Sequence, residues 1–477
     1  MIEAFLALWD QTHSAFDQQR TFERARRLAL SQLVCMGRHT LTQLIAASGY
    51  HDRDWSADYR LFEQTRFQSS ELFRVARQAV EAHLPARVPF VALMDDTLFR
   101  KRGRQVAGTA WRRDPLGPPF QCNLVWGQRF LQIAAALPER SGPSPARAIP
   151  IDFLHCPSPQ KPRRTESDEA WAVYRVQQKA ASLSQCGVQR LQALRRALDD
   201  EAGGRDRSLI VAVDGSFTNG AVLKRLPART TLVGRVRKDA KFYALPKASS
   251  GVGRKKSYGS RLPTPEQIRR DPTIPWQTVR IFAAGKEHEV RVKTAAPLRW
   301  RAAGGDCNLR LVIVAPLAYR PTKSSRLRYR NPTYLICTDI TLSLQTIVQI
   351  ALWRWEVEVS FRDEKTLLGA EQPQIRIPKA VETVPPFLAA SYAFLLLAAH
   401  QTDSLPQTLH SMQPKWNRKS VSQRPSTAQL ISLLRNQLWG LGMEPAHFSG
   451  FVAPSSHNSK PFFLQNSLPS AVFFASQ

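Results

Sequence analysis

The segment from Arg354 to Lys365 places one carboxylate between two cations. At 3.6 residues per turn, Arg354, Glu358 and Lys365 fall on one face of a helix. An acid in this position can bind a divalent ion, while the flanking bases contact a phosphodiester. An ordinary surface helix with charge pairs four residues apart has the same spacing, so the segment alone leaves both interpretations open.

Two earlier segments each end an apolar run on an acid. Residues 88–97 reach Asp95 and Asp96, and residues 208–217 reach Asp214. Such runs are typical of strands buried on both faces, and the acids then emerge at the carboxyl ends, where α/β sheets place their sites. Either acid could instead belong to a turn or cap a helix. Together with Glu358, they favour a metal-dependent phosphoryl-transfer enzyme.

The expected cofactor is a pair of Mg²⁺ ions, for which Mn²⁺ can substitute. Carboxylate oxygens suit these hard ions, and two-metal sites hold them about 4 Å apart. Arg354 and Lys365 would steady the phosphates, with Arg354 better suited to a bidentate grip. No constellation of Ser, Tyr or Cys in the sequence indicates a covalent protein intermediate.

The elements that must position these acids are predicted along the chain. Residues 1–80 are helical in pattern, and 37–49 form a capped amphipathic helix that fits either a helix-turn-helix DNA reader or a plain helical bundle. Three strand-like pieces in 88–136 predict an antiparallel meander. Residues 143–162 are rich in proline and predict a connector, and 165–200 are mostly helical.

A long stretch between Asp214 and Glu358 predicts an inserted β-rich domain. It exceeds what one crossover requires and contains five strand patterns, at 231–236, 278–282, 289–293, 309–314 and 333–337. Residues 343–368 are expected to form the helix that carries Glu358. The apolar run 387–399 is too short to span a bilayer and predicts a buried helix. One further helix is expected at 427–439 within an otherwise poorly ordered tail.

Composition favours a polyanionic partner. The chain has 67 Lys and Arg against 38 Asp and Glu, a net charge of +29, and its bases lie in several clusters and not in one tail. A groove that follows double-stranded DNA fits this distribution better than a membrane, because no basic amphipathic helix has a matching apolar face. The six cysteines form no close Cys pair, and the N-terminus lacks signal-peptide features, so a reduced cytoplasmic location near the nucleoid is expected.

The ordered acids Asp96, Asp214 and Glu358 resemble those of the DDE transposases of bacterial insertion sequences. The insertion sequence 4 superfamily carries a Tyr-x2-Arg-x3-Glu-x6-Lys motif, whose last three positions match Arg354, Glu358 and Lys365, whereas Ala351 stands at the tyrosine position. The Asp-Asp-Thr at 95–97, the Asp-Gly-Ser-Phe at 214–217 and the segment 54–62 are similar to the insertion sequence 701-like branch. The resemblance covers about residues 20–400.

The resemblance implies an α/β fold: an RNase H-like mixed sheet with flanking helices, an inserted β-rich domain and an N-terminal helical domain. The expected divisions are 1–80 for DNA binding, 81–222 and 339–400 for the catalytic domain, 223–338 for the insertion and 401–477 for a partly disordered tail with a possible dimerisation role. Asp96, Asp214 and Glu358 would be both catalytic residues and metal ligands. Asp96 is preferred over its rival Asp95 because the family's first acid directly precedes a threonine. The expected DNA contacts are Arg354, Lys365, Arg362, Lys101, Arg102, Arg235, Arg237 and Lys238.

The function implied is cut-and-paste transposition by a homodimer in a synaptic complex with transposon ends and target DNA. Two alternatives remain open. One is an RNase H-like nuclease or resolvase that cuts without joining, and the other is an inactive DNA-binding descendant, suggested by Ala351 alone. Glu356 and Glu364 lie off the Arg354–Glu358–Lys365 face and are expected to face solvent.

Overall fold

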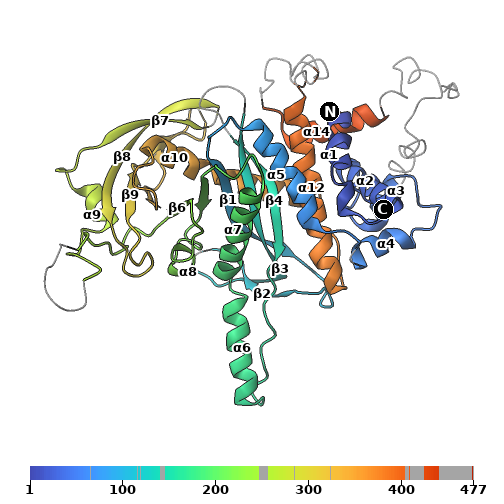
Figure 1. Cartoon of the computed structure of the whole chain (residues 1–477), viewed down its shortest axis with the longest axis horizontal. Helices are drawn as coiled ribbons and strands as arrows, with labels where there is room; N and C mark the ends of the chain where they lie inside the picture. The colour runs from blue at the N-terminus through green and yellow to red at the C-terminus, as the bar shows by residue number, and fades with distance from the viewer. Residues whose placement is uncertain are drawn as a thin grey trace.

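The computed structural model describes residues 1–477 except 65, 115–116, 119, 140–145, 247–255, 284, 323, 403–404, 406–407, 409–423, 440–474 and 476–477. Helices on one side, a central sheet and a β-rich extension on the other side follow one another along the longest axis of the molecule (Figure 1). Most of the tail 401–477 therefore lies outside the described residues.

A mixed sheet is the centre of the fold. It contains β1 (Phe90–Arg100), β2 (Ala110–Arg113), β3 (Leu124–Pro138), β4 (Ala146–His155), β5 (Leu209–Val213) and β6 (Thr230–Arg235). β3 pairs antiparallel with β1, and both β2 and β4 pair with β3. β5 lies parallel to β1, and β6 lies parallel to β5. The five-strand order β4-β3-β1-β5-β6, with its antiparallel and parallel pairs, is that of an RNase H-like sheet.

The strands expected in the insertion extend this same sheet. β12 (Thr333–Cys337) pairs antiparallel with β6, and β9 (Leu309–Val314), β8 (Lys286–Leu298) and β7 (Gln277–Ala283) follow it outward. The short pair β10 (Ala318–Tyr319) and β11 (Arg328–Tyr329) forms a separate hairpin. All five predicted strand patterns are thus confirmed as strands: the first, at 231–236, is β6 of the central sheet, and the other four extend that sheet outward.

Alternating residues of β1 separate two hydrophobic layers. Val91 and Leu93 join a core cluster with Val357 and Phe361, which lie on α11 (Trp355–Thr366), next to α10 (Leu344–Trp353). Ala92 and Met94 instead join the larger cluster with α5 (Ser69–His83), α7 (Leu183–Asp200) and α12 (Pro378–Gln401). Period-two alternation therefore assigns α10 and α11 to one face of the sheet and α5 and α7 to the other.

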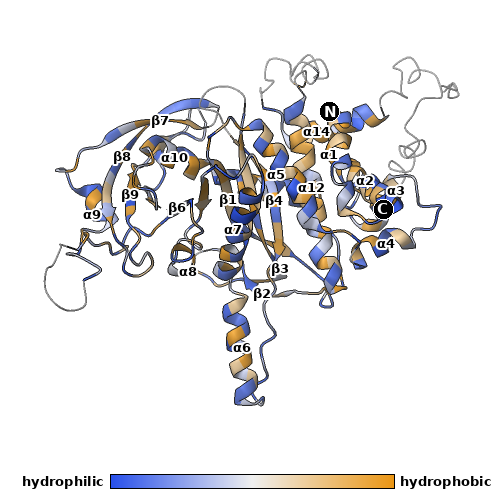
Figure 2. Ribbon diagram, in the orientation of Figure 1, coloured by the Kyte–Doolittle hydropathy of each residue, from blue (hydrophilic) through white to orange (hydrophobic). Residues whose placement is uncertain are grey.

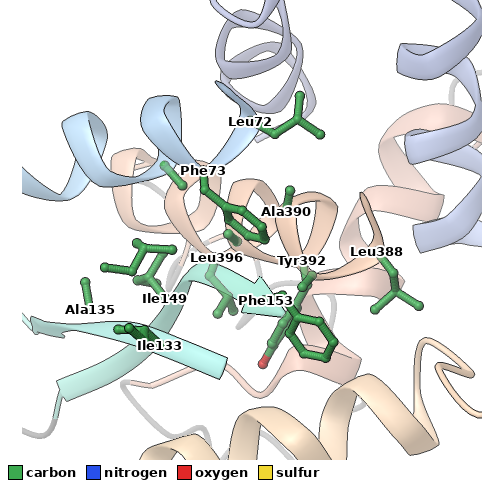
Figure 3. Close-up of a cluster of buried hydrophobic side chains, with 14 of the residues drawn as sticks. Leu72, Phe73, Ile133, Ala135, Ile149, Phe153, Leu388, Ala390, Tyr392 and Leu396 are labelled. Carbon is green, nitrogen blue, oxygen red and sulfur yellow. The ribbon is translucent and has the colours of Figure 1, made fainter. Parts of the chain in front are cut away.

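The larger cluster joins the N-terminal helices to the sheet through α12. Figure 3 shows Leu72 and Phe73 of α5 above Ile133 and Ile149 of the strands, with Leu396 of α12 beside them. The N-terminal elements are α1 (Ile2–Asp10), a 3-10 turn (His13–Ala15), α2 (Gln19–Val34), α3 (Leu41–Ala47) and α4 (Ser56–Glu63). In the part of the chain that is described, α12 alone is long and apolar enough to cross a membrane, and 89% of its most apolar window is buried inside the protein. The expected buried helix is thus confirmed.

Figure 2 shows apolar residues concentrated on the central strands and on α12. In contrast, α6 (Asp168–Ala180) projects away from the sheet and has no buried residue. Three short or late helices complete the fold: α8 (Gly220–Leu223), α9 (Pro265–Arg270) and α14 (Thr427–Trp439). The last of these confirms the helix expected at 427–439.

Two expectations about local structure are wrong. The predicted connector 143–162 contains β4, which pairs with β3 and is largely buried, because its apolar residues outweigh the proline at position 150. The single helix expected over 343–368 is two helices, which meet at Arg354. The expected meander is partly confirmed, since the second strand piece pairs with the third but lies on the side of β3 away from β1.

Candidate active site

Asp95 and Asp214 lie on neighbouring parallel segments: Asp214 directly follows the end of β5, whereas Asp95 lies within β1, which continues to Arg100. β1 and β5 pair in register up to Met94 and Val213, so each acid is the next residue of its strand. The side chain of Asp214 accepts hydrogen bonds from the backbone N–H of Ser216 at 2.8 Å and from its hydroxyl at 2.6 Å. This turn fixes the Asp214 carboxylate just beyond the carboxyl end of β5, as its apolar run predicts. The prediction that the first strand ends at its acids is wrong, because β1 continues past Asp95 and Asp96 to Arg100 and keeps pairing with β3.

Arg354 connects Asp95 with Glu358. Its Nη1 donates to Oδ2 of Asp95 at 2.6 Å, and its Nη2 donates to Oε1 of Glu358 at 2.7 Å. Because Arg354 lies at the junction of α10 and α11, the guanidinium reaches the sheet while the next turn presents Glu358. The carboxylates of β1 and α11 are thereby held on opposite sides of one cation.

Asp96 points to the opposite face of the sheet. Its Oδ2 lies 3.3 Å from Nε of Arg129, which belongs to β3. The structure therefore brings Asp95, and not Asp96, to the Arg354–Glu358 pair. Asp214 is close enough to influence both acids electrostatically.

Burial is the main influence on the acids of β1. It raises the pKa of Asp95 to about 7, while Arg354 opposes the shift and the negative charge of Asp214 adds to it. Burial also raises the pKa of Asp96, with Arg129 acting against it and Asp214 reinforcing it. A second cation near Asp95 would lower its pKa and favour the carboxylate form.

The donor set suits a hard divalent cation. Asp95, Asp214 and Glu358 offer only oxygen ligands, and Arg354 supplies positive charge between two of them. Among the residues that the structure describes, no group of three or more His, Cys, Asp or Glu is already arranged to hold a metal ion. The chemistry of these side chains suits a hard ion, and in this structure the Arg354 guanidinium bonds to two of the three carboxylates.

The two lysines expected at the site have different surroundings. Lys365 lies 3.7 Å from Oε1 of Glu371, and burial lowers its pKa. Lys101 is buried, and its Nζ donates to the carbonyl oxygens of Glu371 and Pro373 at 2.9 and 2.8 Å. The prediction that Lys101 contacts DNA is contradicted by this geometry, because its ammonium group holds the segment after α11.

The other expected DNA contacts lie at the surface. Arg362 is 65% exposed and contacts Asp363, and Arg237 is 85% exposed and contacts Asp239. The remaining three are also exposed: Arg102, Arg235 and Lys238. Ala351, at the position of the motif tyrosine, packs partly buried against the apolar cluster of α10 and α11.

A buried polar chain beside the carboxylates was not predicted. Gln132 of β3 is the register partner of Asp95, and its Nε2 donates to Oγ of Ser360 at 3.0 Å. Ser360 in turn donates to Oε1 of Glu364 at 3.2 Å. Gln132 and Glu364 are fully buried, and Ser360 is 2% exposed. We refer to these three residues as the polar tie.

The polar tie overturns the expectation that Glu364 faces solvent. Positions 357, 360, 361 and 364 have the spacing of one helical stripe, and all four are buried against the sheet. Burial raises the pKa of Glu364 to about 8, with Ser360 acting in the opposite direction. Glu356 is only partly buried and pairs with Arg424 at 2.6 Å. The burial of Glu364 could have been predicted from the sequence, because helical spacing places Ser360 and Glu364 beside the apolar residues Val357 and Phe361.

Comparison with known proteins shows the family of the chain. The family model described as DDE superfamily endonuclease matches residues 13–303, which include Asp95, Asp96 and Asp214 and end before Glu358. A comparison with curated proteins found no match.

Proposed function

Since the chain belongs to the DDE superfamily endonucleases, we propose that it is a cut-and-paste DNA transposase of the insertion sequence 4 superfamily, 701-like branch. The family implies DNA as the substrate and metal-dependent phosphoryl transfer as the chemistry. The observation that best supports an active enzyme is that Arg354 donates hydrogen bonds to both Asp95 and Glu358. It places the carboxylates of β1 and α11 around one cation, next to the strand end that carries Asp214.

Mg²⁺ is the proposed cofactor, and Asp95, Asp214 and Glu358 are the proposed ligands. Asp95 is selected by its contact with Arg354, whereas the family pattern selects Asp96 because it precedes Thr97. When bound, the ions would activate the attacking water or 3′-OH and neutralise the leaving oxygen.

Arg354 has two proposed positions. In the absence of DNA its guanidinium neutralises Asp95 and Glu358, and with DNA bound it moves to the scissile phosphate, which it can hold through two parallel N–H bonds. This movement frees both carboxylates at the moment when the substrate arrives. Lys365, which lies near the end of α11 and 3.7 Å from Glu371 in the following segment, would contact the next phosphate.

The protein is proposed to act as a homodimer that holds two transposon ends together in the bacterial cytoplasm, close to the nucleoid. The net charge of +29 supports association with DNA throughout this process. A nuclease that cuts without joining is the second candidate. It is favoured by the family description, which names an endonuclease and no strand transfer.

The test uses the full chain with labelled DNA that contains the ends of the element, a target plasmid and Mg²⁺ or Mn²⁺. A transposase gives cut ends and then labelled target, while a nuclease gives cut ends alone. Glu358→Gln should abolish both products. Intact DNA with the wild-type protein would identify an inactive DNA-binding descendant, and cutting by Glu358→Gln at the wild-type rate would overturn the proposed site.

A further inference from the structure

Four arginines surround one hollow beside the catalytic sheet. Arg38, Arg102, Arg104 and Arg376 line a cleft of about 370 Å³ together with Gln105 and Gln374. All four arginines are exposed, and none forms an ion pair with a carboxylate in the described part of the chain. The cleft therefore combines a concentrated positive charge with amide groups that can also donate hydrogen bonds.

The cleft lies where three segments meet that are far apart in the sequence. Arg38 lies between α2 and α3, Arg102 and Arg104 follow β1, and Arg376 follows α11. The cleft thus lies between the N-terminal helices and the sheet that carries Asp95. A ligand bound there would contact both parts of the protein at once.

Hydrogen bonds between these segments hold the cleft in shape. The N–H of His39 donates to Oε1 of Gln372 at 2.5 Å, and Gln32 donates to the carbonyl of Leu368 at 2.7 Å. On the other side, the N–H of Ala107 donates to the carbonyl of Ile375 at 3.1 Å. The buried ammonium group of Lys101 binds the carbonyls of Glu371 and Pro373.

A glycine completes this arrangement at the end of α11. Gly369 has a φ of +61°, and a Cβ there would lie 2.7 Å from Cβ of His39. The chain can therefore turn closely past the N-terminal segment. The arginines project from a fixed frame, which lowers the entropic cost of ligand binding.

We propose, on the basis of the DNA substrate proposed above, that this arginine cleft binds the phosphate backbone of the duplex whose end is cut at Asp95, Asp214 and Glu358. Guanidinium groups match phosphates in charge and can bind them bidentately. Backbone contacts position a duplex without reading its sequence, so the cleft would set the distance between the cut and the DNA held by the N-terminal helices.

The length of β1 gives the expected position of these phosphates. Five residue steps separate Asp95 from Arg100, the last residue of the strand. At about 3.3 Å per residue they span about 17 Å. DNA rises about 3.4 Å per base pair, so for a duplex proposed to run along β1 the phosphates contacted just beyond Arg100 would lie about five base pairs from the cut, or about half a helical turn.

The test measures binding of the full chain to a fluorescent duplex of mixed sequence, without metal, at several salt concentrations. Two double variants are compared with the wild type: Arg102→Ala with Arg104→Ala, and Arg38→Ala with Arg376→Ala. Each should weaken binding and reduce the magnitude of the negative slope of log K against log salt by about one to two. Arg270→Ala with Arg280→Ala is the control double variant. It removes the same two positive charges from exposed positions outside the cleft. Replacing the cleft residues with lysine should restore most of the slope.

The proposal is overturned if both cleft pairs, folded as judged by thermal melting, change the slope no more than the control pair does. The salt dependence of binding is measured without DNA cleavage, so it tests the cleft separately from the proposed activity. If the cleft variants reduce the salt dependence but the wild-type protein does not cut DNA, only the proposed activity is refuted. With a substrate that the protein cuts, ethylation of phosphates about half a helical turn from the cut should block binding. Interference confined to phosphates elsewhere would refute the placement.

Discussion

Nη1 of Arg354 donates to Oδ2 of Asp95 at 2.6 Å, so a residue at the start of α11 bonds to two of the proposed metal ligands, Asp95 on the sheet and Glu358 on the helix. The two carboxylates are free of this cation only when the Arg354 side chain moves. A cation that enters the site must compete with Arg354, and this competition leads to the first prediction.

Arg354→Gln should bind Mn²⁺ more tightly than the wild type in the absence of DNA, by about fivefold or more, because a positive charge beside the ligands is removed. The same variant should cut DNA at least about a hundredfold more slowly, because the phosphate loses its bidentate partner. Calorimetric titration with Mn²⁺ and a cleavage assay measure the two effects. Arg74→Gln, which removes an arginine paired with Glu71 on α5 away from the proposed ligands, is the control and should change neither by more than a few-fold.

The two aspartates of β1 should differ in their effect. Asp95→Asn should abolish Mn²⁺ binding and reduce cleavage at least about a thousandfold, since it removes a ligand beside Arg354. Asp96→Asn should chiefly release Arg129, its partner at 3.3 Å on the other face, and retain measurable cleavage. The reverse order of effects in one cleavage assay would assign the ligand to Asp96.

The polar tie should position Glu358. Gln132→Leu and Ser360→Ala break the link between β3 and α11, and each should weaken Mn²⁺ binding about tenfold or more, as outer-shell substitutions do. Ser391→Ala is the matched control, because this buried serine donates only to the carbonyl of Phe387 in its own helix. Equal Mn²⁺ affinity of wild type and both tie variants would show that the link is only structural.

Glu364 should make the protein less stable as the pH rises. Burial raises the pKa of Glu364 from 4.5 to about 8, so the folded state binds more protons than the unfolded state between these values. The free energy of unfolding should therefore fall from about pH 4.5 to pH 8, by at most about 1.4 kcal/mol for each unit of pKa difference.

Glu364→Gln removes this contribution while keeping an oxygen that accepts from Ser360. The variant should melt close to the wild type at pH 5 and at a higher temperature at pH 8. The charged neighbour Lys365 and the titratable neighbours Asp363 and Tyr392 are unchanged in the variant, so they cancel in the comparison. Parallel melting curves across this range would show that Glu364 titrates normally.

The strands that carry the site were predictable because their apolar runs are unbroken. The run at 209–213 lies between two other strands and is buried throughout, so composition alone defines it. The choice between Asp95 and Asp96 was not predictable in the same way. Adjacent residues of a strand point to opposite faces, and only the position of α11 decides which face carries Glu358.

Glu364 and Lys101 show why charge is a poor guide to exposure here. Both are ionisable residues in polar stretches, yet each is buried by contacts with residues distant in sequence or by its place on a packed stripe. The arginine cleft likewise depends on three segments that meet only in the folded chain. A single sequence shows the clusters of bases, whereas the fold determines which of them converge.

The outer strands β7, β8, β9 and β12 continue the hydrogen bonding of the central sheet, because β12 pairs with β6 and β6 pairs with the strand that leads to Asp214. Deleting the outer strands β7, β8, β9 and β12 would expose the backbone groups of β6, leaving an open edge next to the strand that leads to Asp214. Such an edge invites pairing with other chains and aggregation. Truncated forms of this protein that lack the outer strands would therefore need another element that covers the edge of β6 to stay soluble.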